Sequence, residues 1–166
     1  MKTISKAVIS DCGRYRYRLS RCWDESRPLC LFIMLNPSTA DHKVDDRTVK
    51  RCIGFAKSWG YGGFYVGNLF AFRTSKPSKM KGAADPVGPE NRYHLERMAR
   101  KVVRSGGMCI AAWGEDGRHR QQDQTVIAWF AEFGIQLHYL KLTKNSKIPR
   151  HPLYLRGGLK PMVWKT

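Results

Sequence analysis

The sequence has no clustered cysteine motif, and this absence excludes several kinds of site. Its cysteines stand at 12, 22, 30, 52 and 109, and none belongs to a C-x-x-C pair. A zinc or iron–sulfur site is therefore not expected. A disulfide framework is not expected either, because the number is odd and Cys30, Cys52 and Cys109 lie in apolar segments, where free cysteine behaves as a small buried hydrophobe. No metal or other cofactor is predicted.

Long apolar runs are also missing. No stretch approaches the roughly 18 residues that a membrane span needs, and Met1 to Ser10 lacks the apolar segment of a signal peptide. We therefore expect a cytoplasmic protein without membrane association. Because no internal repeat, linker or low-complexity segment interrupts the 166 residues, we expect one domain, 1–166, and a monomer.

Acidic residues are scarce. There are 13 Asp and Glu against 30 Lys and Arg, which gives a net charge of +17. Residues 141–166 carry seven cations and no acidic residue. Because self-repulsion of this size costs stability, a polyanionic partner is the economical explanation. Nucleic acid is the predicted partner, with DNA favoured over RNA. The alternative is a basic protein that has no specific ligand.

The hydropathy pattern predicts alternating strands and helices after an N-terminal β-hairpin extension, 1–28. Between Arg14 and Leu19, arginine alternates with Tyr and Leu, which predicts a half-buried strand whose arginines are solvated or face phosphate. Apolar runs predict further strands at 29–35, 64–70, 108–113 and 136–142. Amphipathic periodicity predicts helices at 46–59, 90–104 and 121–133.

This order predicts an α/β fold, a three-layer sandwich with a mostly parallel central sheet flanked by helices on both faces. The basic segment 141–166 follows the last strand. In open α/β sheets, ligands bind beyond the carboxyl ends of the strands. The rule selects four loops as the candidate site: 36–41, 68–73, 113–116 and 143–154.

Several side chains in these loops suit recognition of a nucleobase. Asn68 ends an apolar strand, and its amide offers a donor and an acceptor that match a base edge; its alternative role is to form a turn. Phe70 and Phe72 are candidates for stacking on a base, or else belong to the core. Arg73 is a phosphate ligand or a surface charge. His151 lies in a basic loop, where an imidazole can donate to a developing oxyanion.

Six segments form a signature that covers nearly all of the chain after residue 28. In their order they resemble a family of unknown function from bacteria and phages, domain-of-unknown-function family 1643. The segments are Leu31–Asp41, Asp46–Thr48, Asn68–Arg73, Asp85–Asn91, Ala112–Gly114 and Arg150–Tyr154.

The same order of loops is similar, more distantly, to the uracil-DNA glycosylase superfamily. Leu35–Ser38 is similar to the water-positioning motif that follows the first strand there. Asn68 stands in the place of the asparagine that reads the pyrimidine edge. His151–Tyr154 is similar to the C-terminal loop that carries a base-contacting histidine and a residue that wedges into the duplex. Leu153 and Tyr154 stand where that family has Ser-Pro, which pinches the DNA phosphate.

The resemblance implies a uracil-DNA-glycosylase-like fold and a protein that extrudes a damaged or modified pyrimidine into a strand-end pocket, since the glycosidic bond is unreachable inside the stack. Asn36, with Asp41 as second choice, would position water, and His151 would stabilise the departing base. The expected base-binding residues are Pro37, Ser38, Asn68, Phe70 and Phe72. The expected contacts to the nucleic-acid backbone are Arg47, Arg51, Arg73, Lys144, Lys147 and Arg150.

Two alternatives stay open. The first is a DNA- or RNA-binding module that has kept the pocket and lost the chemistry, which the missing Ser-Pro favours. The second is an enzyme that acts on free nucleotides or RNA, which would show little salt-sensitive affinity for duplex DNA.

Overall fold

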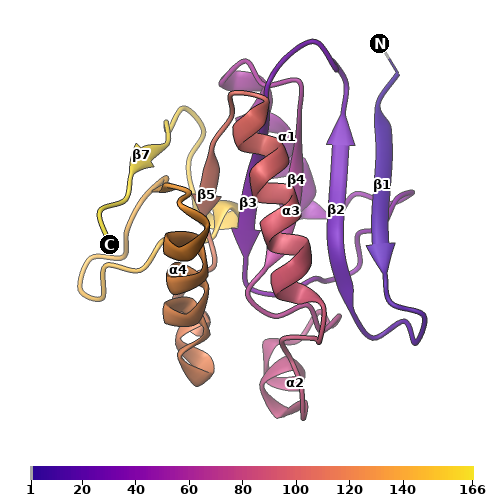
Figure 1. Cartoon of the computed structure of the whole chain (residues 1–166), viewed down its shortest axis with the longest axis vertical. Coiled ribbons are helices and arrows are strands. Elements are labelled where there is room, and N and C mark those ends of the chain that lie inside the picture. Colours follow the sequence, from indigo (N-terminus) through magenta and orange to yellow (C-terminus); the bar gives the residue numbers. More distant parts are fainter. Residues whose placement is uncertain (1) are drawn as a thin grey trace.

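The computed structural model describes residues 2–166 and contains one seven-stranded sheet, ordered β1-β2-β4-β3-β5-β6-β7. Four helices flank it (Figure 1). The strands are β1 (Ile4–Ile9), β2 (Arg16–Cys22), β3 (Leu29–Met34), β4 (Gly63–Asn68), β5 (Cys109–Ala111), β6 (Leu137–Tyr139) and β7 (Met162–Val163). The helices are α1 (Arg47–Ser58), α2 (Pro77–Gly82), α3 (Asn91–Arg104) and α4 (Gln122–Phe133), with short 3₁₀ segments η1 (Glu115–Gln121) and η2 (Pro152–Tyr154).

The helices cover both faces of the sheet, which confirms the predicted α/β class. Leu31 and Ile33 of β3 pack with the buried residues of α3 and α4. Cys30 and Phe32, whose side chains alternate with these, pack with α1 on the opposite face. Figure 1 shows α3 and α4 in front of the strands and α1 behind them. Because β3 is covered on both faces, it is apolar along its whole length, as expected of a buried parallel strand.

The sheet is mixed, so the prediction of a mostly parallel sheet is not confirmed. The central strands β4, β3, β5 and β6 run parallel. The outer pairings β1·β2, β2·β4 and β6·β7 are antiparallel. The N-terminal hairpin was expected as an extension, but β2 pairs with β4 and continues the main sheet. The basic C-terminal segment also joins the sheet, because β7 adds an antiparallel edge beside β6.

A β-bulge in β2 overturns the predicted alternation of buried and solvated side chains. Ile9 pairs with Arg16 and Val8 pairs with Arg18, which leaves Tyr17 as the extra residue. One extra residue shifts the alternation of side chains by one position, so residues an odd number apart on either side of the bulge point to the same face of the sheet. Arg16 and Arg21 therefore both turn inward, toward the loop after β3, and their side chains are only 4% and 2% exposed.

The predicted helices are present at α1, α3 and α4, within two residues of the expected ends. Asp46 caps α1 by accepting a hydrogen bond from Val49 N at 2.8 Å. Helix α2 and segment η1 were not predicted, since both lie in stretches of mainly polar sequence. In the range 2–166, none of the helices combines the length and apolar character needed to cross a membrane.

Candidate functional site

A cavity of about 390 Å³ opens at the carboxyl ends of β3 and β5. The chain leaves β3 through α1 on one face and leaves β5 through α4 on the other. Connections that diverge in this way leave a crevice between the two strand ends, where ligands bind in open α/β sheets. Leu35 and Asn36 line it after β3, and residues 113–116 line it after β5; the remaining lining residues are Pro77, Thr143, Arg150, His151 and Tyr154.

Asn36 is held so that its carbonyl oxygen is available to a ligand. Its Nδ2 donates to Thr74 O at 2.9 Å and to Pro37 O at 3.1 Å, which ties the loop after β3 to the loop after β4. No hydrogen bond from residues 2–166 reaches Oδ1, so a free acceptor stands at the cavity wall. An acceptor in this position can orient a water molecule or bind a donor on a ligand.

His151 contributes a neutral donor. Its Nδ1 accepts a hydrogen bond from Leu153 N at 3.2 Å, which assigns the ring proton to Nε2. Burial lowers the pKa of His151 to about 4, an effect that the nearby carboxylate of Asp46 opposes. The imidazole is therefore uncharged at neutral pH, and its remaining ring N–H can donate to a ligand in the cavity.

The segment after β5 contributes an aromatic residue, a glycine and two carboxylates to the cavity lining. Trp113 is buried, and the backbone then turns at Gly114, whose φ of +79° suits glycine. Both carboxylates already have partners. Glu115 accepts from Ser146 Oγ at 3.0 Å, and Asp116 pairs with Lys81 at 2.6 Å.

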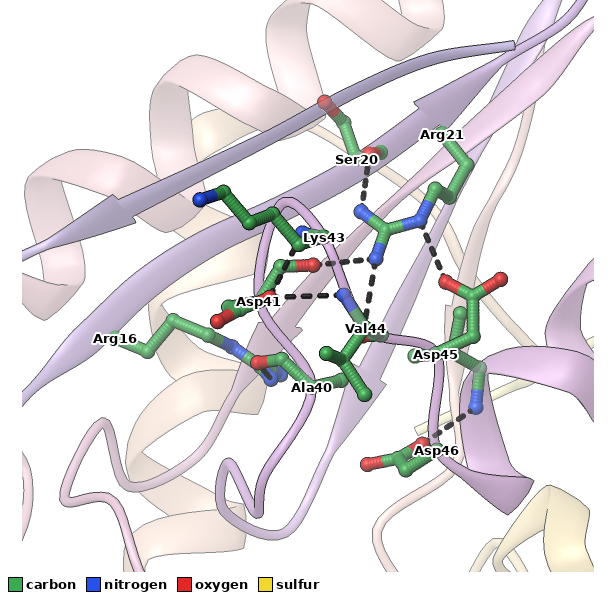
Figure 2. A network of polar contacts seen from close by, with 10 residues as sticks. Arg16, Ser20, Arg21, Ala40, Asp41, Lys43, Val44, Asp45 and Asp46 are labelled. Atoms are coloured by element: carbon green, nitrogen blue, oxygen red, sulfur yellow. Dashed lines mark hydrogen bonds and ion pairs between the residues drawn. The ribbon is translucent and has the colours of Figure 1, made fainter.

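The rest of the loop after β3 is anchored by the two buried arginines of β2 (Figure 2). Arg16 Nη1 donates to Ala40 O at 2.8 Å. Arg21 donates to Asp41 O and pairs with Asp45 at 2.8 Å. The loop backbone thus acquires partners that the sheet does not provide, and this fixes the position from which Asn36 projects.

Asp41 does not reach the cavity. Its Oδ1 accepts from Lys43 N at 2.7 Å and from Val44 N at 2.9 Å, and these bonds lower the pKa of its carboxyl group. The carboxylate therefore closes its own turn. Its predicted second-choice role in positioning water finds no support in this geometry.

All five predicted base-binding residues lie outside the cavity lining. Asn68 is 2% exposed, and no described residue accepts a hydrogen bond from its Nδ2. Phe70 is buried in the core, and Phe72 packs edge-on against the ring of Tyr15 at 6.3 Å. Pro37 is buried and Ser38 half-buried beside Asn36, but neither lines the cavity.

The predicted backbone-contacting cations fall into three places. Arg150 lines the cavity itself. Arg47 and Arg51 line an open groove beside it, on α1. Lys144 and Lys147 are exposed on the turn after β6 that begins at Thr143, a lining residue. Arg73 is apart from these, near the hairpin turn at Gly13.

Sequence reasoning missed two kinds of residue. The strand-end rule selected 113–116, but no ligand role was given to Trp113 or to Gly114, although an aromatic residue at a buried strand end is a usable signal. Nothing in the sequence marked Arg16 and Arg21 as interior residues, because their burial depends on a bulge and on a loop folding back.

In the chain from residue 2 onward, no group of three or more His, Cys, Asp or Glu side chains is placed to hold a metal ion. The sequence model of one protein family, described as "Protein of unknown function (DUF1643)", matches residues 16–153. No curated protein and no solved structure matches the chain.

Proposed function

The chain belongs to the DUF1643 family of unknown function, as its motifs predicted, and we propose that its strand-end cavity binds a nucleobase displaced from a DNA strand. The observation that carries this proposal is the pairing, in one cavity, of a neutral N–H donor on His151 with a free acceptor on Asn36. Base edges present donors and acceptors side by side, and uncharged partners match them without burying a net charge.

The form of the cavity supports the same ligand. Its volume of about 390 Å³ lies within the range of small-molecule sites, which are concave and carry few convergent polar groups. Trp113 closes the inner end of the cavity as a buried aromatic residue. Arg150 at the rim and the net charge of +17 favour a ligand that carries phosphates.

The proposed reaction is hydrolysis of the N-glycosidic bond of a damaged or modified pyrimidine. The bond between the sugar C1′ and the base nitrogen breaks, and the base departs with the electron pair. His151 donates its Nε2–H hydrogen bond to the departing base and remains bonded to that proton. A water oriented by Asn36 Oδ1 adds its oxygen to C1′, and its released proton neutralises the base. The resemblance to uracil-DNA glycosylases supports this order of events.

A second candidate function is binding without hydrolysis. Both carboxylates that line the cavity already have partners, in Ser146 and Lys81, and the carboxylate of Asp41 closes a turn. The water would therefore be oriented by a neutral amide and not activated by a free base. This observation favours a module that retains the base pocket alone.

The deciding experiment is a strand-cleavage assay after alkali, which detects abasic sites, on oligonucleotides that each carry one modified pyrimidine. The hydrolase predicts abasic sites with one of these bases, their loss in His151→Ala, and their retention in His42→Ala, an exposed histidine away from the cavity. Base-selective binding without cleavage would assign the second function. Absence of both base release and base-selective binding would overturn the base pocket.

A further inference from the structure

A basic groove adjoins the cavity. It runs between the first two turns of α1 and the segment that follows His151. Its cations are Arg47, Lys50 and Arg51 from α1 and Arg156 from the C-terminal segment. Its other lining residues are Leu153, Tyr154 and Leu155, so no carboxylate lies among them.

Sequence spacing and packing together build this groove. Arg47, Lys50 and Arg51 share one face of α1, because residues three and four apart are neighbours on a helix. Arg51 holds the opposite wall in place, since its guanidinium donates to Leu155 O and lies 5.1 Å from the centre of the Phe55 ring. The remaining cations, Arg47, Lys50 and Arg156, are exposed and make no side-chain hydrogen bond or ion pair with any described residue.

Tyr154 joins the groove to the cavity. It lines both, and it is 74% exposed, the highest value among the large hydrophobic residues that the structure describes. An aromatic ring left in solvent at this junction gains nothing from the core. It is placed to stack on a flat ligand that passes from the cavity into the groove.

The charges around the cavity give the ligand a direction. Glu115 and Asp116 line the cavity beside Arg150, whereas the groove that adjoins it at Tyr154 is lined by four cations and no carboxylate. A ligand with a neutral end and an anionic end would therefore place its neutral end in the cavity. Its anionic end would leave past Tyr154 toward α1.

From this arrangement we infer that the groove binds the sugar–phosphate backbone of a single-stranded polynucleotide, with Tyr154 stacking on the base next to the one in the cavity. The inference deepens the proposed function and rests on it for the occupant of the cavity. A basic track beside an aromatic platform is how proteins hold single strands without reading their sequence, because only an unpaired base offers a free face.

The test is fluorescence anisotropy with a labelled oligothymidylate, which reports backbone and stacking contacts. The double variant Arg47→Gln/Lys50→Gln should weaken binding about tenfold and lower the magnitude of the salt slope by about 1.4, since each single-strand phosphate contact contributes about 0.7. The control Lys2→Gln/Arg104→Gln removes the same charge from exposed positions outside the groove and should change affinity less than twofold. Equal losses of affinity in both double variants would overturn the inference that the groove binds the strand.

Tyr154 is tested in the same assay. Tyr154→Ala should weaken binding about five- to hundredfold, as loss of a base-stacking ring does, and Tyr154→Phe should restore it. Parallel titrations use oligouridylate, a duplex of equal length and thymidine monophosphate. Tighter binding of either single strand identifies it as DNA or RNA, whereas preference for the duplex or equal affinity for the mononucleotide would overturn the inference.

Failure of this inference can be told apart from failure of the proposed function. If the groove variants bind oligothymidylate as the parent does while the parent releases a base, the inference about the groove is wrong and the proposed function of the cavity is retained. If the groove variants lose strand binding while no oligonucleotide shows base release or base selectivity, the groove binds a strand as inferred and the cavity has another ligand.

Discussion

Two of the loops that line the cavity differ in how arginine side chains serve them. The loop 36–46 is anchored by the buried side chains of Arg16 and Arg21, which donate hydrogen bonds to its backbone carbonyl groups. The loop 140–156 is held mainly by backbone turns, such as Thr143 N to Ile148 O at 2.8 Å, and near its end by Arg51 of α1, which donates to Leu155 O. It turns Arg150 toward the cavity.

The difference shows that the cationic side chains of this protein have two separate roles. Arg16 illustrates the first, because burial lowers its pKa to about 10, a cost that a solvated cation would not incur. Such residues stabilise a loop and are not available to a ligand. The exposed cations around His151 are the second, and they carry the electrostatic attraction for a polyanion.

The largest effect expected is loss of stability in Arg21→Met. The change leaves the carbonyl oxygens of Ser20 and Asp41 without their donor, at about 1–3 kcal/mol for each buried acceptor that stays unsatisfied. The lost pair with Asp45 adds less, because that carboxylate is 35% exposed. Urea unfolding followed by tryptophan fluorescence measures the loss. The control Arg104→Met, on the exposed face of α3, should stay within about 0.5 kcal/mol. A similar small change for Arg21→Met would mean that the loop 36–46 keeps its position without this anchor.

A second stability effect is expected in Asn68→Asp, at the residue that the sequence predicted to read a base edge. Asn68 is buried outside the cavity lining, so the change should cost about 3 kcal/mol for a buried charge without a partner. Burial raises the pKa of the new carboxyl, so stability should recover as the pH falls below its folded-state pKa.

The measurement is a pair of unfolding curves, at pH 7 and pH 5, together with binding to oligonucleotides that differ in one base. A variant that is as stable as the parent but ranks those bases differently would restore Asn68 to the ligand site.

The sequence predicted the buried strands and the amphipathic helices well, because periodicity is a local property. The apolar face predicted for α1 was Val49, Cys52, Ile53, Ala56 and Trp59. Val49, Cys52 and Ala56 are buried, whereas Ile53 and Trp59 are half-buried. The strand-end rule also selected Asn36 and His151, which line one cavity. It could not separate them from Asn68, because the rule names the end of a strand and not the direction of a side chain.

What escaped prediction depends on contacts between distant segments. The bulge at Tyr17 changes which face each following residue of β2 occupies, and no local pattern marks its position. The pairing of β2 with β4 joins residues more than forty positions apart. The burial of Arg16 and Arg21 follows from both events. The sequence alone therefore predicted that the alternating arginines of this strand are solvated or face phosphate.

A pH titration sharpens the comparison, because the loop 140–156 contains the half-buried, neutral imidazole of His151. His151 has a folded-state pKa of about 4 against 6.5 for a free imidazole, so the unfolded chain binds its proton first. Stability is therefore fully present above pH 7 and falls as the pH drops from about 6.5 to 4, by at most about 1.4 kcal/mol per pH unit.

Unfolding curves between pH 8 and pH 4 measure this fall, and His151→Gln should make it shallower. His94, whose pKa is also lowered to about 4 by burial and by the charges of Arg18 and Arg97, should account for part of the remainder. A parallel fall in His151→Gln and the parent would show that His151 titrates as in water.

The smallest effect is expected from Asp116→Asn in the lining of the cavity. Its pair with Lys81 is exposed, with side chains 48% and 40% accessible, and exposed pairs contribute between 0 and about 1 kcal/mol. Stability should therefore change by less than about 0.5 kcal/mol. Affinity for a single strand should instead rise about twofold at low salt, because one repulsive charge leaves the rim and Lys81 is freed. The matched change Asp11→Asn, in the distant hairpin turn, should leave affinity as it was. If both variants raise affinity equally, net charge alone attracts the strand, and the carboxylate of Asp116 has no part in orienting it.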